Sequence, residues 1–393
     1  MHQEKIFENT EIAFALKSQE ELSRAHFMFR MMGNATLVKA GSFLTKKSLQ
    51  IGLPVKGLIR NTIYKQFCGG ETEQDCIPVI KRLHNKQVSS MMDFSVEGKA
   101  NEADFDAAML KKIELVDFAV ANEEISIIII KPTALGRFGL WQKVTEKKEL
   151  NITEQEEWER ITNRFDAICK ATYNANLSIL IDAEESWMQD AADDLVELMM
   201  RRYNKERVTV YNTLQCYRWD RTDYLEALHK RAKSEGFKLG IKIVRGAYME
   251  KERERAEELG YNSPICEDKA HTDRTFNNAL TYILNHTEDI SVFVGTHNEE
   301  SSYLAMQLMV EKNLPTNSNA VWFGQLYGMS DHISFNLAKK GYNNAKLIPF
   351  GPVKEVIPYL IRRAEENTSV AGQTSRELAL ISKEMKRRKG ITK

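Results

Sequence analysis

Eight short apolar segments recur between residues 88 and 352, and sequence with a helical pattern separates most of them. They are VSSMMDFSV (88–96), ISIIIIKP (125–132), LSILIDAE (177–184), VTVYNTLQ (208–215), LGIKIVRG (239–246), ISVFVGTH (290–297), AVWFGQLYG (320–328) and AKLIPFGP (345–352). Near-continuous apolar strands that alternate with helices are typical of a parallel sheet covered on both faces. Eight such strands favour an α/β fold of the (βα)8 TIM-like barrel type. A doubly wound open sheet is the alternative, although no GxGxxG motif follows any strand.

The sequence before the first strand has a helical pattern throughout. The stretch SQEELSRAHFMFRMMG begins with Ser18 as a candidate N-cap, and Glu21 three residues later completes a capping box. This stretch holds more apolar residues than one narrow helical stripe requires, so it either packs on something larger or docks a partner. We therefore predict an N-terminal helical lobe over residues 1–85 and a barrel domain over residues 86–393.

Charge and cysteine content limit the class of protein. The chain has 55 Lys and Arg against 55 Asp and Glu, a balance that gives no reason to expect a nucleic-acid partner. Five scattered cysteines without metal-ligand spacing indicate free thiols in a reducing compartment and no metal site. No apolar run is long enough to span a membrane, and the N-terminus lacks a signal-peptide pattern. We expect a cytoplasmic protein that is at most peripheral at the inner membrane.

Polar side chains follow the predicted strands at the point where each strand ends. These residues are Asp93, Lys131, Asp182, Gln215, Lys242, Arg245, Thr296, His297 and Gln325. Any one of them, taken alone, is more often structural than catalytic. Seven strands, however, would bring them to the carboxyl-terminal face of one barrel, where barrel enzymes place their active sites.

The segment KLGIKIVRGAY (238–248) combines a buried strand with a cationic turn. Lys242 and Arg245 place two cations at the strand end, and Gly246 leaves backbone N–H groups open to close approach by a ligand. Tyr248 adds a ring suited to stacking. Positive charge, bare backbone and an aromatic ring together suit a flavin, whereas a β-turn with solvated cations is an equally good interpretation of this segment alone.

Two arginines lie on one face of the predicted helix after the last strand. Tyr359, Arg362 and Arg363 have the spacing i, i+3 and i+4. Paired guanidinium groups suit bidentate binding of a carboxylate, whereas ion pairs with Glu366 on the same helix are the structural alternative. The following segment ELALISKEMKRRK is a basic helix with a solvated face, and attraction to an anionic membrane surface is a minor alternative for it.

Several of these segments together resemble the proline dehydrogenase family, in its stand-alone form with the mitochondrial-type motif pattern. The matching stretches are SSMMDFSVEG, ILIDAEESW, VYNTLQCY, KLGIKIVRGAYMEKERERAEELGY, GTHNEES, FGQLYGMSDHIS and PFGPVKEVIPYLIRRAEEN. The resemblance implies a distorted (βα)8 barrel and no attached aldehyde dehydrogenase module. It also implies FAD-dependent oxidation of L-proline to Δ1-pyrroline-5-carboxylate, the first step of proline catabolism. In the family a hydride passes to flavin N5 and the electrons pass on to a quinone.

The same resemblance assigns roles to individual residues. It implies that FAD contacts Gln215, Lys242, Val244, Arg245, Gly246, Ala247, Tyr248, Thr296 and His297. It implies that the substrate contacts Lys131, Leu326, Tyr359, Arg362 and Arg363, the last three on a C-terminal clamp helix. Two residues carry implied catalytic roles: Asp182 orders the site, and Lys242 places positive charge beside the flavin N5 and so favours the reduced flavin.

The chain departs from the family pattern at Leu347, four residues before Gly351. Proline-selective members commonly have a tyrosine there that excludes a ring hydroxyl, so 4-hydroxyproline is an alternative substrate. Two other classes of function stay open. One is a flavin-free barrel enzyme that uses Lys131 or Lys242 as a Schiff-base nucleophile. The other is a non-catalytic binding protein of the same fold.

Overall fold

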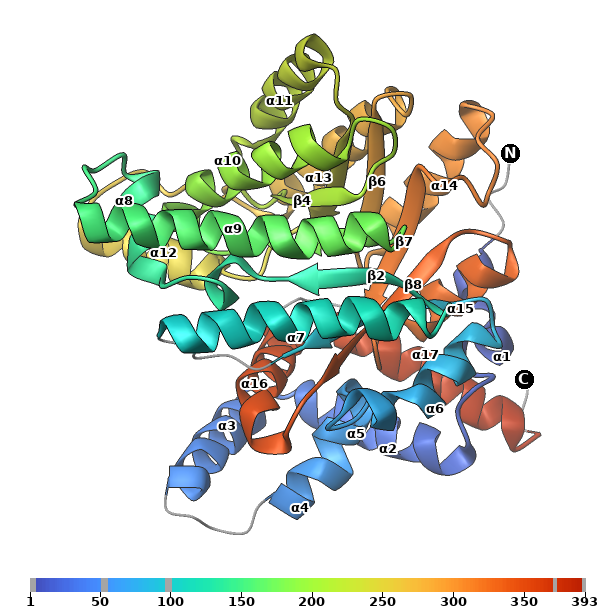
Figure 1. Ribbon diagram of the computed structural model, residues 1–393. Helices are drawn as coiled ribbons and strands as arrows, with labels where there is room; N and C mark the ends of the chain where they lie inside the picture. Colours follow the sequence, from blue (N-terminus) through green and yellow to red (C-terminus); the bar gives the residue numbers. More distant parts are fainter. Residues whose placement is uncertain (1–4, 51–55, 96–100, 370–372, 391–393) are drawn as a thin grey trace. The chain divides into compact units, whose positions relative to one another are not determined.

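Eight parallel strands form a closed barrel in chain order in this computed structural model, which describes residues 5–50, 56–95, 101–369 and 373–390 (Figure 1). The strands are β1 (Ser89–Phe94), β2 (Ile125–Ile130), β3 (Ser178–Ile181), β4 (Val210–Gln215), β5 (Leu239–Val244), β6 (Ile290–Gly295), β7 (Val321–Leu326) and β8 (Asn344–Phe350). Seven of them lie within the predicted segments, and β8 begins one residue before its predicted segment. The last strand pairs in parallel with the first, with Ser89 opposite Ala345. The predicted barrel is therefore confirmed, and the open-sheet alternative is wrong.

The chain divides into two compact units, which are described separately. Unit 1 comprises Met1–Glu97 and Gly324–Lys393, and unit 2 comprises Gly98–Phe323. Unit 1 thus contains β1, β8 and the helices at both ends of the chain, whereas unit 2 contains β2 to β6 with their connecting helices. The division predicted at residues 85 and 86 stays a prediction.

Unit 2 alternates strands and helices in the manner of a barrel wall. Its helices are α7 (Glu102–Val120), η3 (Pro132–Ala134), α8 (Phe138–Thr145), α9 (Ile152–Asn174), α10 (Ser186–Tyr203), α11 (Arg221–Glu235), α12 (Met249–Leu259), α13 (Lys269–Leu284) and α14 (Glu299–Glu311). β2 reads ISIIII, a run of branched residues that favours a strand and tolerates burial on both faces. α7 and α9 run on either side of β2 and contact each other (Figure 1). Helices therefore cover the strands, as in other parallel sheets.

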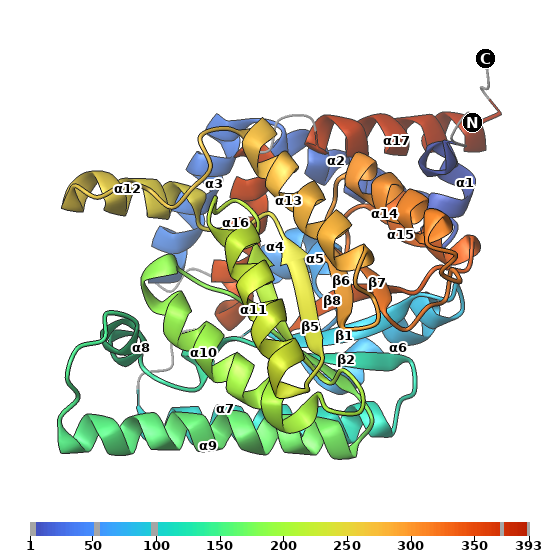
Figure 2. The same cartoon turned by 90° about the horizontal axis from the view of Figure 1, so that it is seen from above.

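Unit 1 brings the two ends of the chain together. Its helices are η1 (Ile6–Glu8), α1 (Thr10–Ala13), α2 (Gln19–Met32), α3 (Ala35–Gln50), α4 (Lys56–Ile59), η2 (Arg60–Tyr64), α5 (Lys65–Phe67), α6 (Glu73–His84), α15 (Asp331–Lys339), α16 (Val353–Ser369) and α17 (Gln373–Arg388). The predicted capping box of α2 is confirmed: Ser18 Oγ accepts from the Glu21 N–H at 3.1 Å, and Glu21 Oε2 accepts from the Ser18 N–H at 2.7 Å. α17 lies along α2 and α1, so residues near both termini share one core (Figure 2).

The core of unit 1 uses one face of α2 and the apolar face of α17. Leu22 and Phe29 from α2 pack with Leu360 from α16 and with Leu380 and Ile381 from α17. The apolar side of the basic C-terminal helix is therefore buried. In the part of the chain that the structure describes, no helix combines the length and the apolar character needed to cross a bilayer. All five cysteines are buried free thiols, as the sequence predicts.

Candidate active site

An ion pair joins the ends of two barrel strands in unit 2. Asp182 follows β3 directly, and its backbone N–H donates to the Ile130 carbonyl of β2 at 2.9 Å. The Nζ of Lys242, on β5, donates to Asp182 Oδ1 at 2.5 Å. Lys242 is 9% exposed, so its ammonium group is fixed beside the carboxylate and largely shielded from water. The structure thus brings together the two residues with predicted catalytic roles.

Arg245 is the first residue after β5, and its neighbours in unit 2 hold its side chain rigidly. Its Nε donates to Asp273 Oδ1 at 2.8 Å, and its Nη1 donates to Thr296 Oγ1 at 2.9 Å. Its Nη2 donates to Ser301 Oγ at 3.0 Å, and its guanidinium lies 4.5 Å from the centre of the Phe276 ring. Three polar partners and one ring leave this cation little freedom, which suits a group that must meet an anionic or polar ligand in one orientation.

The backbone that follows Arg245 is bare and exposed. Hydrogen bonds from the Cys216 N–H to the Val244 carbonyl and from the Tyr217 N–H to the Arg245 carbonyl hold the chain up to this point. Gly246 then has φ +133°, and both it and the following alanine are exposed. An ideal Cβ at Gly246 would lie 2.5 Å from the Tyr217 ring. The segment is therefore exposed main chain in a conformation open to glycine and closed to larger residues.

The other predicted cofactor residues surround this segment in unit 2. Val244 ends β5, Tyr248 is the N-cap residue of α12, and Thr296 and His297 follow β6. Thr296 is buried, whereas Tyr248 and His297 are half-buried. Gln215, at the end of β4, is buried, and its Nε2 donates to the Glu184 carbonyl at 3.0 Å. A bare turn, two fixed cations and polar strand ends are residue types that fit a large, flat, anionic cofactor.

Glu184 is a buried carboxyl group two residues after Asp182. It accepts the Thr133 N–H at 2.9 Å and lies 2.7 Å from the Thr133 hydroxyl, so it holds the segment that carries Lys131. Burial raises the pKa of Glu184 to about 7, although the Thr133 hydrogen bonds and the charge of Lys131 oppose the shift. Because the folded state keeps a proton that the unfolded state releases, this group lowers the stability as the pH rises from about 4.5 to 7.

We expect Glu184→Gln to remove this pH dependence. Near pH 5 the variant should be about as stable as the parent, because an amide can replace a protonated carboxyl against the Thr133 hydroxyl and N–H. Above pH 7 the variant should be more stable than the parent by about 3 kcal/mol. This is the free energy that corresponds to a shift in the pKa of Glu184 from 4.5 to about 7. Urea unfolding from pH 4.5 to 8.5 measures both curves.

A matched control is Glu197→Gln, which changes a buried carboxylate that accepts hydrogen bonds from Arg201 and Arg231. That substitution should lower the stability at neutral pH because it weakens two charge-assisted hydrogen bonds. Parallel curves for the parent and Glu184→Gln across the whole range would contradict a proton on Glu184 in the folded state.

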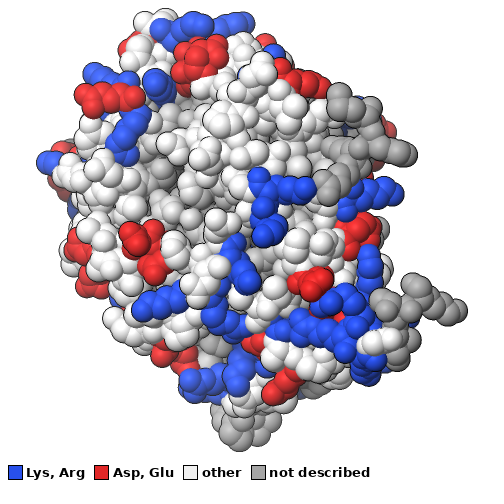
Figure 3. All heavy atoms as spheres, turned by 90° about the vertical axis from the view of Figure 1, so that its right-hand side faces the viewer, with Lys and Arg blue, Asp and Glu red and all other residues white. Residues whose placement is uncertain are grey.

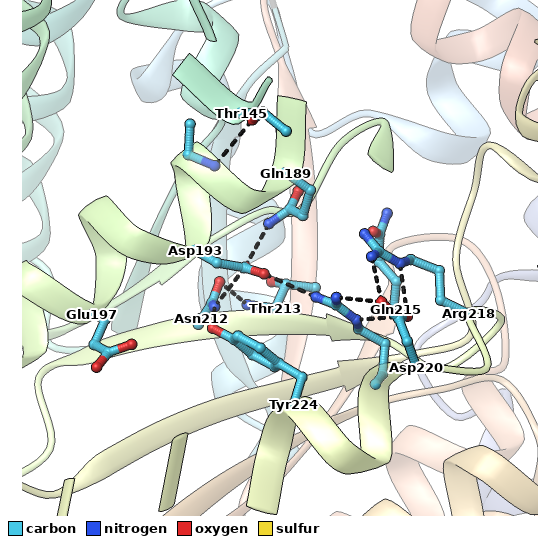
Figure 4. Close-up of polar contacts among 12 residues, drawn as sticks. Thr145, Gln189, Asp193, Glu197, Asn212, Thr213, Gln215, Arg218, Asp220 and Tyr224 are labelled. Atoms are coloured by element: carbon cyan, nitrogen blue, oxygen red, sulfur yellow. Dashed lines mark hydrogen bonds and ion pairs between the residues drawn. The ribbon is translucent and has the colours of Figure 1, made fainter. Parts of the chain in front are cut away.

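A buried polar network lies behind the strand ends of unit 2 (Figure 4). Asp193 of α10 accepts from Gln189 Nε2 at 2.8 Å and from Asn212 Nδ2 at 2.9 Å, both at Oδ1. Its other oxygen accepts from Arg221 Nη1 at 2.9 Å. Gln189 Oε1 in turn accepts the Glu184 N–H at 2.8 Å. The network therefore links the β4 strand, two helices and the segment that carries Asp182 and Glu184.

The predicted substrate residues Leu326, Tyr359, Arg362 and Arg363 lie in unit 1. On α16, Tyr359 is 6% exposed, both arginines are half-buried, and the Arg363 guanidinium lies 5.2 Å from the centre of the Tyr359 ring. The side chain of Glu366, the alternative partner of these arginines, lies outside the described residues.

Leu326 and Leu347 are linked through the backbone between them. The Tyr327 N–H donates to the Leu347 carbonyl at 2.8 Å, and Lys346 Nζ donates to the Leu326 carbonyl at 3.3 Å. Both leucines are half-buried. The departure at position 347 thus lies next to the predicted substrate residue at position 326.

Gln325, near the end of β7, does not contribute its side chain to the carboxyl-terminal face of the barrel, although the sequence predicts that it does. The Gln325 side chain accepts from Ser334 Oγ at 2.8 Å and from Asn344 Nδ2 at 2.9 Å, so it contacts α15 and the start of β8. The reason is strand alternation, because Gln325 and Leu326 point to opposite faces of β7. Sequence reasoning also passed over Asp273, Ser301 and Glu184. The first two lie on helices with no local signal, whereas Glu184 follows a strand end and could have been included.

Comparison with known proteins places the chain in a family. Residues 76–376 match the family described as proline dehydrogenase. The carbapenem antibiotics biosynthesis protein CarD of Pectobacterium carotovorum subsp. carotovorum is 32% identical, over 85% of this chain and 86% of the relative. Mitochondrial proline dehydrogenase 1 of Dictyostelium discoideum is 32% identical, over 87% of this chain and 68% of the relative. Hydroxyproline dehydrogenase of Xenopus laevis is 30% identical, over 95% of this chain and 88% of the relative.

The fold has counterparts among solved structures. The crystal structure of proline utilization A (PutA) from Bdellovibrio bacteriovorus inactivated by N-propargylglycine aligns with a TM-score of 0.73 and 18% identity. The alignment covers all of this chain and 43% of that protein, so the chain spans less than half of its length. This likeness concerns the fold. The family match over most of the chain and the relatives at 30% identity or more make the chain a member of the proline dehydrogenase family.

Proposed function

We propose that this protein is an FAD-dependent dehydrogenase that oxidises L-proline to Δ1-pyrroline-5-carboxylate and passes the electrons to a quinone. The observation that carries the proposal is the arrangement of unit 2 around the end of β5. There a rigid Arg245, the exposed backbone at Gly246 and the Lys242–Asp182 pair follow one strand. Family membership supplies the reaction, and the names of several relatives agree with it.

The residues of unit 2 fit the cofactor in chemical type. Arg245 would meet the anionic part of FAD, and the N–H groups around Gly246 would donate to its polar atoms. Gln215, Thr296 and His297 would add side-chain hydrogen bonds, and Val244, Ala247 and Tyr248 would add apolar and ring contacts. FAD supplies the two-electron oxidation when it is bound. The protein's part is to orient the substrate and to exclude water.

The Lys242–Asp182 pair would set the electrostatics of the reaction. The Lys242 ammonium is an oriented positive charge in a shielded place, so it stabilises negative charge that develops beside it more strongly than it would in water. Asp182 holds the ammonium in position and is thus a positioning residue for it. Lys131, on the segment fixed by Glu184, would add a second positive charge for the substrate carboxylate.

Arg363→Ala should raise the KM for proline about thirtyfold or more and leave FAD bound. The substrate carboxylate would lose a charge-assisted, forked partner, and such hydrogen bonds contribute about 1.5–3 kcal/mol. Steady-state kinetics and the flavin content of the purified variant measure the two effects. Arg363→Lys keeps the charge without the fork, so it should recover only part of the loss. Loss of FAD in Arg363→Ala would contradict the assignment of this arginine to the substrate.

A hydroxyproline dehydrogenase is the second candidate, because Leu347 stands where a tyrosine would exclude a ring hydroxyl. The similarity to a protein named hydroxyproline dehydrogenase agrees with it. Leu347→Tyr should raise the ratio of the kcat/KM for proline to that for 4-hydroxyproline about tenfold, and Leu347→Met should leave it unchanged. Equal ratios in all three proteins would mean that position 347 does not contact the substrate ring.

The proposal is tested by an absorption spectrum before and after anaerobic addition of L-proline. Flavin bands that bleach would support both the cofactor and the substrate. Bands that bleach only with hydroxyproline would favour the second candidate, and bands that bleach with neither would favour a binding protein. A colourless protein that takes up no FAD and is trapped by borohydride with a carbonyl compound would instead favour a Schiff-base enzyme.

A further inference from the structure

A lysine side chain is completely buried in unit 1. Lys346 lies on β8 and is 0% exposed. On the face of the molecule shown in Figure 3, by contrast, Lys and Arg lie at the surface with Asp and Glu among them, where water screens their charges. An ammonium group is costly to bury, so it stays in a protein interior only where acceptors satisfy its donors. The acceptors of Lys346 therefore indicate what this residue holds in place.

Three acceptors meet the three donors of the Lys346 ammonium group. Its Nζ lies 3.0 Å from Asp331 Oδ1, and it donates to the Leu326 carbonyl at 3.3 Å and to the Met329 carbonyl. All three acceptors belong to residues 326–331, the β7–α15 loop. One buried side chain on β8 thus contacts both ends and the middle of the loop that begins at the predicted substrate residue Leu326.

The backbone of the β7–α15 loop needs support from its surroundings. Gly328 has φ +81°, and Ser330 has φ +49°, which is uncommon for a residue with a side chain. Such conformations persist where neighbouring groups fix them. An ideal Cβ at Gly328 would lie 2.0 Å from the Gln66 carbonyl oxygen, so α5 packs directly against the loop. The shape of the loop is therefore set from outside.

Three further side chains of unit 1 contact the same loop. Gln66 Nε2, on α5, donates to the Gly328 carbonyl at 2.8 Å. Lys17, which precedes α2, lies 3.2 Å from Asp331 Oδ2, and Glu377 of α17 accepts a loop N–H. Two lysines thus face two carboxylates, and the charges balance. The helices near both ends of the chain converge on the loop that carries Leu326.

The loop also fixes Leu326 relative to Leu347. The Tyr327 N–H donates to the Leu347 carbonyl at 2.8 Å, and Leu347 follows Lys346 directly on β8. Both leucines are half-buried and neither has a polar group to pair with a ring hydroxyl. The space between them, and not a hydrogen bond, would therefore distinguish one substrate ring from another.

We propose that Lys346 and Asp331 form a positioning pair that sets the width of the site for the substrate ring. By fixing the β7–α15 loop, the pair keeps Leu326 and Leu347 at a constant separation, and the ring is selected by its fit between them. Lys346 itself does not touch the substrate in this assignment, because it alternates with Leu347 on β8 and its ammonium group faces the loop. The inference rests on the proposed function and adds to it the device that selects between proline and 4-hydroxyproline.

Steady-state kinetics of Lys346→Met with L-proline and with 4-hydroxyproline tests the proposal. Methionine keeps a similar volume and removes all three contacts. The kcat/KM for proline should fall about tenfold, mainly through a higher KM, which corresponds to lost contact with two ring methylene groups. The ratio of the kcat/KM values for the two substrates should move towards one, because a loosely held wall selects less. FAD should stay bound, since the loop carries no predicted cofactor residue.

A double variant separates positioning from stability. Lys346→Met should lower the urea midpoint by about 1 M, because it leaves the Asp331 carboxylate buried with one cation fewer. Lys346→Met with Asp331→Asn removes both charges and should recover most of that loss. It does not restore a donor to the Leu326 and Met329 carbonyls, so its kcat/KM and its substrate ratio should stay as in the single variant. A role in stability alone predicts that activity returns with the urea midpoint.

Lys17→Met tests the same loop at a milder position. The Lys17 side chain is 19% exposed, so this variant is expected to fold. Its kcat/KM for proline should fall about threefold, the effect of one partly exposed ion pair, and its substrate ratio should shift in the same direction. Lys17→Arg keeps the charge and should return both quantities to within twofold of the parent.

Arg207→Met is a matched control in unit 2. Arg207 is a half-buried cation that donates to the Tyr173 carbonyl and, at 3.4 Å, to the Leu177 carbonyl, just before β3. Like Lys346, it holds backbone carbonyls, but it does so at the amino-terminal end of a strand, away from the face where barrels place their active sites. The control should lower the urea midpoint and leave the KM and the substrate ratio within twofold of the parent.

Hydrogen exchange of the loop amides gives a measurement that needs no turnover. In the parent the Tyr327 N–H donates to the Leu347 carbonyl and the Ser330 N–H donates to Glu377. Exchange of peptides that cover residues 326–331 should be about tenfold faster or more in Lys346→Met and in the double variant. Because the double variant recovers its stability, faster exchange there reports local loosening of the loop and not global unfolding.

Two results would overturn the proposal. One is a double variant with the kcat/KM and the substrate ratio of the parent. The other is loop exchange in both Lys346 variants that is no faster than in the parent. A parent whose flavin bands bleach with neither proline nor hydroxyproline would instead refute the proposed function. The two failures are distinguishable, since loop exchange is measured without substrate.

Discussion

Gly246→Val is expected to abolish FAD binding and to lower the free energy of unfolding by on the order of 3 kcal/mol. Gly246 has φ +133°, a conformation that side chains with a Cβ rarely adopt and that a β-branched residue adopts least. Its Cβ would also lie 2.5 Å from the ring of Tyr217, which is 2% exposed and cannot move freely. The backbone would have to leave the position from which, in the proposed function, its N–H groups would donate to FAD.

The flavin content of the purified variant and its urea unfolding curve measure the two effects. Gly260→Ala is a matched control, because Gly260 has φ +70° at the end of α12 and an ideal Cβ there meets nothing within 4 Å. In that control the free energy of unfolding should fall by about 1–2 kcal/mol, because alanine is strained in the left-handed backbone conformation, and FAD should stay bound. A Gly246→Val protein with full flavin occupancy would contradict a close approach of the cofactor to this backbone.

The barrel and the position of its polar face could be predicted from the sequence because both depend on local pattern. Each strand is a short apolar run, and strand ends in a closed parallel barrel meet on one face whatever the helices do. The Lys242–Asp182 pair follows from that rule, since both residues come from predicted strand ends. Gln325 is an exception, because neighbouring residues on a strand face opposite ways and its side chain contacts α15 and the start of β8.

The partners that orient the site could not be predicted in the same way. Asp273 and Ser301 hold Arg245 from two different helices, 28 and 56 residues further along the chain. Their sequence surroundings resemble any capped amphipathic helix, so only the closed barrel brings them to the arginine. The role of α2 is a similar case. Its surplus of apolar residues was visible in the sequence, but only the structure separates a buried face from an exposed one.

Arg221→Ala is expected to destabilise the protein by about 3–5 kcal/mol, the cost of removing one partner from a buried ion pair. Arg221 is 5% exposed and Asp193 is 4% exposed, and the pair joins α11 to α10 at 2.9 Å. Arg221 also donates to both oxygens of Asp220, at 3.1 and 2.7 Å. Alanine would leave the Asp193 carboxylate buried with two amide partners and no cation.

The pH dependence of the protein's stability gives an independent test of the ion pairs that Arg221 makes. Burial opposes ionisation of Asp220, but hydrogen bonds from Arg221 and Arg218 lower its pKa to about 2. A depressed carboxyl pKa contributes stability above the unfolded value of 3.8, and this contribution is lost as the pH falls from about 4 towards 2. The parent should therefore lose stability across this window more steeply than Arg221→Ala does.

A double variant separates the charge from the packing. Arg221→Met with Asp193→Asn removes both charges and keeps similar volumes, so it should be more stable than Arg221→Ala by about 2 kcal/mol in urea unfolding. Because Gln189 links Asp193 to the Glu184 N–H, the single variant should also loosen the segment that carries Asp182. Its flavin should then dissociate faster than in the double variant. A single variant within 1 kcal/mol of the parent would mean that the buried pair contributes nothing to holding α10 and α11 behind the site.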